Sequence, residues 1–249
     1  MKSLRNLVAV LVALVFFTLM AKADSTNSLS DSEIEERALV QKILAQRPSN
    51  NFTNTGTLYI QGGDGPRKKL PVTCETIAGE THWQSRYEAR LSTNSTDVTT
   101  LLVTHEGTDT NHYESDENGG KASAEIGSTQ IAVPFAGSDF WLCDLGLEFF
   151  HWPQQKVLKK EFHRQCACMV LESTNPNPAP GGYSRVVCWI DEDSLGIVEA
   201  YAYDAKGNKL KNFYPKNFEK VNGQYQLQSM VMENVQTGSK SVMEFDLDK

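Results

Sequence analysis

The sequence predicts a mainly β protein of the α+β class, in which about 11 strands form a long antiparallel meander accompanied by two or three helices. From Asn54 onward, apolar and polar residues alternate with the period of two that is typical of a strand with one buried face. Between these runs lie clusters such as Asn222-Gly223 and Thr237-Gly238-Ser239. Gly and Asn supply the positive φ angles that tight hairpin turns require. No repeat and no linker divides the chain, which favours one domain.

The first 23 residues have the order of a secretory signal peptide. Lys2 and Arg5 precede an apolar run from Leu7 to Met20, and Ala21-Lys22-Ala23 follows as a small-residue cleavage pattern. This run is shorter than the roughly 20 residues of a membrane-spanning helix, although an uncleaved N-terminal anchor is the alternative. We therefore expect a signal peptide over 1–23, a single domain over 24–249 and a periplasmic location.

The charge of the mature chain excludes one class of partner. Loss of Lys2, Arg5 and Lys22 lowers the 24 basic residues to 21 against 31 acidic ones, a net charge near −10. Nucleic-acid affinity depends on neutralising phosphates with Lys and Arg, so no nucleic-acid partner is expected. Anionic membrane surfaces are disfavoured for the same reason.

A helix is predicted at the start of the mature chain. Ser30 and Glu33 have the spacing of a capping box, and Pro48 ends the helix. The apolar positions in between follow a helical period, and they are Ile34, Leu39, Val40, Ile43 and Leu44. We expect this amphipathic helix to pack on the rest of the fold.

The strands and a second helix follow from the change of period. The predicted strands are 57–61, 69–76, 82–91, 99–106, 156–164, 166–172, 183–191, 197–204, 209–220, 224–234 and 241–247. The polar segment 108–121 is predicted to be a flexible excursion, and 142–153 a second short helix ended or kinked by Pro153. Ser138 and Asp139 are expected at the N-terminus of that helix, as its N-cap and first-turn acid.

The C-terminal half carries motifs in a characteristic order. They are Gly137-Ser138-Asp139-Phe140-Trp141 with Asp144-Leu145, then Trp189-Ile190-Asp191, Tyr201-Ala202-Tyr203-Asp204 and Lys209-Leu210-Lys211 after Gly207. This block resembles the LolA-like family of outer-membrane lipoprotein-sorting proteins, and the resemblance extends over about residues 130–247. It implies an incomplete antiparallel β-barrel with capping helices around an apolar cavity. It also implies a periplasmic carrier of lipoprotein acyl chains or another lipid, with docking proteins at the inner or outer membrane.

Aromatic side chains are the candidate ligand-binding residues. Trp83 and Tyr87 lie on the apolar face of their predicted strand. The other candidates lie in or beside the second helix or in the family block, and they are Phe140, Trp141, Phe149, Phe150 and Trp152. Burial of acyl chains yields about 0.8 kcal/mol per methylene, so an apolar lining is sufficient for such a ligand. The same residues could equally form an ordinary core.

No catalytic motif is present, and a binding protein is favoured over an enzyme. The alternative function is an envelope sensor or interaction module that binds a protein partner with the same half-barrel. A thiol or metal enzyme built on the cysteines is a third hypothesis, but the chain lacks the second ligand pair of a zinc site. No metal and no cofactor are expected.

Four of the five cysteines are disulfide candidates, because exported proteins favour disulfides. Cys168 is expected to lie roughly opposite Cys188, and Cys166 could pair with Cys143. Cys74 completes the set, and the spacing leaves the pairing open.

Overall fold

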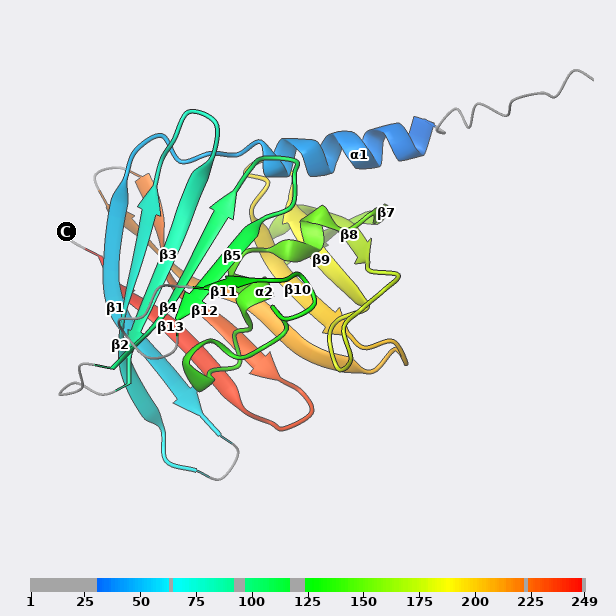
Figure 1. Ribbon diagram of the computed structural model, residues 1–249. Coiled ribbons are helices and arrows are strands. Elements are labelled where there is room, and N and C mark those ends of the chain that lie inside the picture. The colour runs from blue at the N-terminus through cyan, green and yellow to red at the C-terminus, as the bar shows by residue number, and fades with distance from the viewer. Residues whose placement is uncertain (1–30, 63–64, 92–96, 117–123, 222–223, 248–249) are drawn as a thin grey trace, which may run out of the picture.

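An open antiparallel sheet of 13 strands forms the body of the protein (Figure 1). The computed structural model describes residues 31–62, 65–91, 97–116, 124–221 and 224–247. The predicted signal peptide and the Ser30 part of the capping box lie outside these residues. The order of the strands is β6-β5-β4-β3-β2-β1-β13-β12-β11-β10-β9-β8-β7, and the sheet does not close on itself. The predicted incomplete β-barrel is confirmed, with 13 strands where about 11 were expected.

The strands follow the alternation of the sequence closely. Their bounds are β1 Phe52–Gln61, β2 Lys68–Ile77, β3 Trp83–Arg90, β4 Val98–His105, β5 His112–Asp116, β6 Ala124–Ile126, β7 Gln154–His163, β8 Cys166–Thr174, β9 Arg185–Asp191, β10 Ile197–Tyr203, β11 Lys209–Val221, β12 Gln224–Asn234 and β13 Lys240–Asp246.

Two meanders meet in the middle of this sheet. The chain runs from β1 to the β6 edge, crosses to the opposite edge at β7 and returns to β13, which pairs with β1. In this pairing Leu58 lies opposite Met243, and both are fully buried. A Cβ at Gly56 would overlap the carbonyl oxygen of Glu244, so the close approach of β1 and β13 requires a glycine there.

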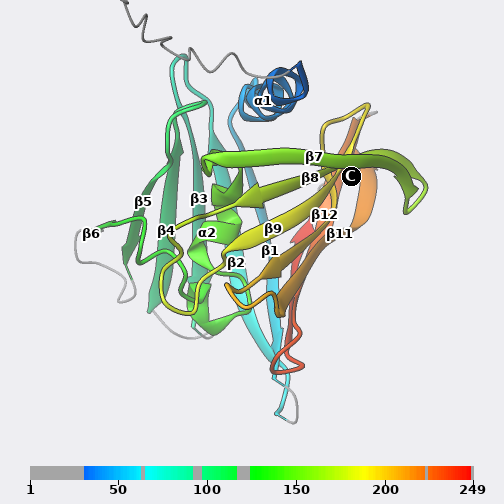
Figure 2. The same cartoon turned by 90° about the vertical axis from the view of Figure 1, so that its right-hand side faces the viewer.

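Residues 127–153, which we call the crossing segment, lie inside the curve of the sheet in both views (Figures 1 and 2). Three short helices form within it: η1 (Phe135–Gly137), α2 (Leu142–Leu145) and η2 (Glu148–His151). Their buried side chains join the apolar inner face of the sheet in one core. The crossing segment therefore occupies the space where a closed barrel would have its interior.

The prediction of one helix over 142–153 is wrong. Leu147 has φ 51° and ψ 40°, a left-handed conformation that ends α2 after one turn. Gly146 lies directly against the Tyr113 side chain, and a Cβ there would overlap the hydroxyl. Packing against β5 thus decides the break, and it cannot be inferred from local helix propensity.

The prediction of a flexible excursion over 108–121 is wrong for residues 112–116, which form β5, and residues 117–121 lie outside the described part. Tyr113 is the only large apolar side chain of β5, and it is 2% exposed. The short strand β6, after the predicted excursion, pairs with β5 and forms the edge of the sheet. These are the two strands that the sequence did not predict.

The 14-residue helix α1 (Asp31–Leu44) packs beside the edge strand β7. Leu39, Val40 and Ile43 are buried as predicted, whereas Ile34 is exposed. The backbone N–H of Val157 in β7 donates to the Glu36 carboxylate at 3.2 Å. The helix therefore protects part of an edge that would otherwise be open to pairing. Within the described residues, α1 and the other helices are all too short or too polar to cross a membrane.

Candidate ligand-binding site

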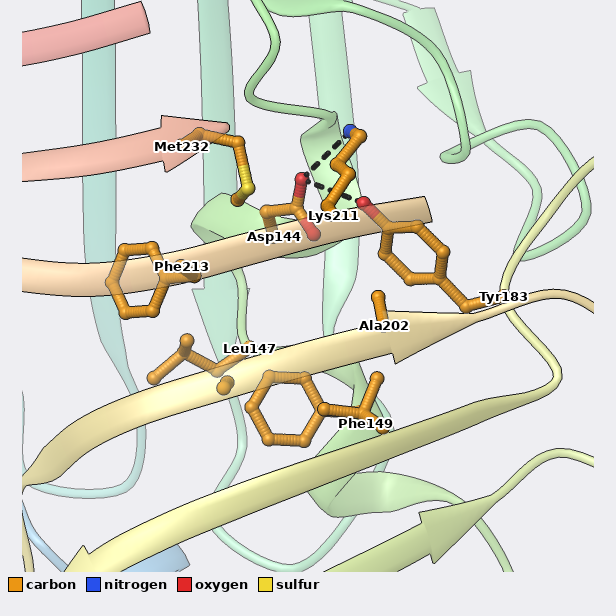
Figure 3. A pocket seen from close by; sticks show the side chains of 10 residues that line it. Asp144, Leu147, Phe149, Tyr183, Ala202, Lys211, Phe213 and Met232 are labelled. Atoms are coloured by element: carbon orange, nitrogen blue, oxygen red, sulfur yellow. Dashed lines mark hydrogen bonds and ion pairs between the residues drawn. The ribbon is translucent and has the colours of Figure 1, made fainter. Parts of the chain in front are cut away.

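A small cavity separates the crossing segment from the inner face of β9 to β12 (Figure 3). Its volume is about 20 Å³, room for roughly one water molecule. Most of its wall is apolar, and the lining residues are Asp144, Leu147, Phe149, Tyr183, Val186, Ala200, Ala202, Lys211, Phe213 and Met232. The cavity forms where the small side chains of Ala200 and Ala202 lie between larger side chains of β9 and β11.

One end of the cavity is polar. The Lys211 ammonium donates to the backbone oxygen of Asp139 at 2.6 Å and to Asp144 Oδ2 at 3.3 Å. It also lies 3.7 Å from the centroid of the Trp141 ring, which is stacked on Tyr183 at 4.6 Å. Lys211 is 2% exposed, and burial lowers its pKa while Asp144 opposes that shift. This buried lysine therefore holds the crossing segment against β11.

Asp144 is the centre of these contacts. Its Oδ2 atom accepts hydrogen bonds from the Trp141 backbone N–H at 2.8 Å and from the Tyr183 hydroxyl at 3.1 Å, besides the Lys211 bond. Burial, together with the Asp144 charge, raises the pKa of Tyr183 well above its usual value, so the hydroxyl stays protonated and donates. All three bonds end on one oxygen of the carboxylate.

The prediction that Ser138 and Asp139 cap the helix is wrong. Trp141 is the N-cap of α2, with Asp144 accepting its N–H. The Asp139 carboxylate instead accepts hydrogen bonds from the Ser239 hydroxyl at 2.5 Å and the Ser241 hydroxyl at 2.8 Å. Asp139 thereby anchors the crossing segment to β13.

A second polar cluster anchors the other side of the crossing segment. The Tyr113 hydroxyl donates to Glu148 Oε2 at 2.9 Å, and the Asn111 amide donates to the same atom at 3.3 Å and to the Gly146 oxygen at 2.8 Å. Burial raises the pKa of Glu148, and these two donors lower it only in part. The segment is therefore bound to β5 by hydrogen bonds, and to β11 by an ion pair.

The seven predicted ligand-binding residues do not gather at the cavity. Only Phe149 lines it. Tyr87, Phe140 and Phe150 are buried in the core, and the Tyr87 hydroxyl donates to the Leu145 oxygen at 3.4 Å. Trp141 lies behind Lys211 and Trp152 beside Phe149, as described by their ring contacts. Trp83 stacks on His105, with ring centroids 3.8 Å apart.

Sequence reasoning missed most of the cavity wall. Val186, Ala200, Ala202 and Phe213 occupy inward positions of neighbouring strands, and the period-two pattern contained that signal. The pattern gave no such signal for Lys211, because a lysine in a strand predicts a position on the solvent-facing side of the sheet. Asp144, Ala202 and Lys211 belong to the motifs that carry the family resemblance, but none of them was predicted to bind the ligand.

All five cysteines carry free thiols in the structure. Leu171, and not Cys168, lies opposite Cys188, while Cys168 pairs with Asp191. The expected opposition is thus wrong, because the β8–β9 loop closes with Thr174 opposite Arg185, and this register places Leu171 opposite Cys188. Burial raises the pKa of Cys143 and Cys188 well above the usual value. These two thiols are therefore poor nucleophiles.

The His163–Cys168 segment forms a hairpin turn between β7 and β8. Arg164 and Gln165 have positive φ angles of 46° and 70°. The His163 Nε2 atom lies 2.6 Å from Glu199 Oε2, and Arg164 donates to Glu199 Oε1 at 2.8 Å. Within the ranges that the structure describes, no three His, Cys, Asp or Glu side chains are grouped as metal ligands.

Comparisons with known proteins agree with this architecture. A protein-family model described as "-like: Uncharacterized protein" matches residues 121–247. The chain belongs to that family. The matched region runs from just before the crossing segment to the last strand and includes every residue that lines the cavity. No curated protein sequence matches the chain.

Solved structures share the fold at low sequence identity. A DUF1329 family protein from Desulfovibrio piger has a TM-score of 0.70 at 19% identity, over 87% of this chain and 92% of its own. A structure from Vibrio parahaemolyticus described as an outer membrane lipoprotein-sorting protein domain has a TM-score of 0.71 at 19% identity, over 86% and 91%. A LolA superfamily protein from Nitrosomonas europaea has a TM-score of 0.59 at 16% identity, over 85% and 91%. The predicted resemblance to LolA-like proteins is confirmed at the level of the fold.

Proposed function

We propose that the protein binds an acyl chain of a lipid or lipoprotein between the inner face of β9–β12 and the crossing segment, as a periplasmic carrier. The observation that carries the proposal is the apolar wall formed by Leu147, Phe149, Val186, Phe213 and Met232 in the concave side of an open sheet. Pockets for apolar ligands are lined mainly by apolar side chains and need few polar groups. The similarity to a lipoprotein-sorting domain supports the proposal.

The cavity in the structure is too small for an acyl chain, since a volume of about 20 Å³ holds roughly one water molecule. Binding therefore requires the crossing segment to move away from the sheet. Along the chain the segment connects the edge strands β6 and β7, and among the described residues only side-chain contacts bind it to the central strands β11 and β13. It can therefore move without breaking the main sheet ladder. Docking proteins at either membrane belong to the same proposal.

The test is ligand extraction and rebinding. The mature chain, exported and purified without detergent, is expected to release acyl material into organic solvent, identified by mass spectrometry. After delipidation it is expected to bind a fluorescent C16 acyl probe at micromolar concentration. Wild-type protein that carries no acyl material and binds no probe would overturn the proposal.

A matched pair of variants locates the site. Ala202 lines the cavity, whereas Ala205 lies exposed in the β10–β11 turn. Ala202→Phe fills the cavity and is expected to weaken probe binding at least tenfold, and Ala205→Phe to leave it unchanged. Circular dichroism and urea unfolding verify that both variants fold, since overpacking costs about 1–3 kcal/mol. Equal binding by both variants would place the ligand elsewhere.

A further inference from the structure

The polar end of the cavity indicates which part of a ligand it recognises. Asp144 Oδ2 receives the hydrogen bonds from Trp141, Tyr183 and Lys211, whereas no described residue donates to Asp144 Oδ1. In Figure 3 both dashed lines from Asp144 start at one oxygen, and none reaches its second oxygen. The Asp144 side chain is 11% exposed, and it lines the cavity. A free acceptor thus lies in an otherwise apolar wall.

Lys211 does not offer a matching donor. Its ammonium is directed to the Asp139 oxygen at 2.6 Å, to Asp144 Oδ2 at 3.3 Å and to the face of Trp141 at 3.7 Å. An ammonium has three N–H groups, and these three partners occupy them. A ligand carboxylate at this end would therefore meet the Asp144 oxygen and no available cation.

We propose that the cavity selects acyl ligands whose polar end is an uncharged hydrogen-bond donor, a hydroxyl or an amide N–H, which donates to Asp144 Oδ1. This inference rests on the proposed acyl-binding function. A ligand that fills the cavity excludes water from Asp144 Oδ1. A carboxylate oxygen that loses water without gaining a donor is costly, and a donor from the ligand removes that cost. A fatty-acid anion is disfavoured by charge repulsion, and an ester without a donor leaves Oδ1 unpaired. A ligand ammonium is disfavoured by Lys211, which is held on the neighbouring oxygen.

The test compares four ligands with the same C16 chain: monopalmitoylglycerol, palmitamide, methyl palmitate and palmitate. Each competes against a fluorescent acyl probe on the delipidated, full mature chain. The two donors are expected to bind about tenfold or more tightly than the methyl ester and the anion, as expected for a hydrogen bond to a charged acceptor. Comparison of the glycerol and amide ligands shows whether the natural donor is a hydroxyl or an amide N–H.

A single substitution is expected to remove the preference for the donor ligands. In Asp144→Asn, the amide oxygen keeps the bonds from Trp141, Tyr183 and Lys211, because the amide NH₂ would face the ammonium otherwise. The NH₂ then occupies the Oδ1 position and donates into the cavity. This NH₂ can donate to the carbonyl oxygen of the methyl ester and of the amide alike, so the variant is expected to lose the preference of the wild type for the two donor ligands. Asp193→Asn, the same change on the exposed β9–β10 turn, is the control and keeps the wild-type order.

The outcomes separate the two proposals. If the wild-type protein binds none of the four ligands, the acyl-binding function itself fails. If it binds them all equally, or the anion or the ester most tightly, acyl binding stands and donor selection is overturned. If Asp144→Asn folds and keeps the wild-type order, Asp144 is not the recognition group, and the proposal is again overturned. The wild-type series decides the question even if the variant fails to fold.

Discussion

Lowering the pH from 7 to 5 is expected to weaken the fold through His105. This residue ends β4, its ring stacks on Trp83 with centroids 3.8 Å apart, and its Nε2 lies 3.2 Å from the Ser85 hydroxyl. Burial, with a smaller contribution from His151, lowers its pKa from 6.5 to about 4, against a hydrogen bond with Asn111 that raises it. The folded protein therefore resists a proton that the unfolded chain accepts.

The sign and the size follow from linkage. Above pH 6.5 the imidazole is neutral in both states, so His105 adds no pH dependence there. Between pH 6.5 and 4 the unfolded chain binds a proton and the folded chain does not, so stability falls as the pH falls. The full effect is about 3 kcal/mol, and the part between pH 7 and 5 is about 2 kcal/mol.

Urea unfolding of wild type and His105→Phe at both pH values measures this effect. Phenylalanine keeps a ring against Trp83 and removes the titration, so the variant is expected to lose about 2 kcal/mol less than wild type between pH 7 and 5. His82→Phe, at an exposed histidine just before β3, is expected to keep the wild-type pH dependence. An unchanged pH dependence in His105→Phe would refute the assignment of the loss to His105.

Three other predictions concern the anchors and the thiols. Lys211→Met leaves Asp144 without its buried cation and is expected to lower the free energy of unfolding, measured in urea, by about 3–5 kcal/mol. The control is Lys209→Met, whose side chain lies against Tyr201, and it is expected to cost under about 1 kcal/mol. Equal losses in the two variants would contradict the ion-pair anchor. Gly146→Ala forces the Tyr113 hydroxyl aside and is expected to lower the free energy of unfolding by about 1–3 kcal/mol. Adding Tyr113→Phe to this variant is expected to recover part of that loss. A fully additive double-mutant cycle would show that the two residues do not clash. Thiol titration of the unreduced, denatured protein is expected to find all five cysteines, with Cys143 and Cys188 unreactive in the folded protein; three thiols would instead reveal a disulfide.

The strands that the sequence predicts are those in which alternation and turn chemistry act locally. β3 and the hairpins from β8 to β13 have this character, because each has an apolar face next to a turn rich in Gly, Asn or Asp. β5 lacks it, since Tyr113 alone carries the apolar face. Its position is determined by Gly146 and Glu148 of the crossing segment, which lies far along the chain. A pattern confined to a few neighbouring residues cannot contain such a contact.

The cavity was harder to predict than the fold for the same reason. Aromatic content marked the crossing segment correctly as apolar, but the wall of the cavity is shared among single residues of β9 to β12. Lys211 is buried only because Asp139 and Asp144, 72 and 67 residues away in sequence, supply its partners. Charge alone assigns such a lysine to the surface, and only the assembled sheet shows why burial is tolerated.

Besides the Asp139 contact with β13, the crossing segment has anchors on β11 and β5. These two anchors differ in the free energy needed to release them, and this bears on how an acyl chain enters. Separation from β11 breaks the buried Lys211–Asp144 pair, a cost of about 3–5 kcal/mol when one partner is left uncompensated. Burial of ten methylenes returns about 8 kcal/mol, which exceeds that cost. On the other side, Glu148 is held by the neutral donors Tyr113 and Asn111 at 2.9 and 3.3 Å, so that contact can persist while the β11 side opens. We therefore expect the segment to swing about its β5 anchor, because this movement opens the side on which the apolar wall and the free oxygen of Asp144 lie.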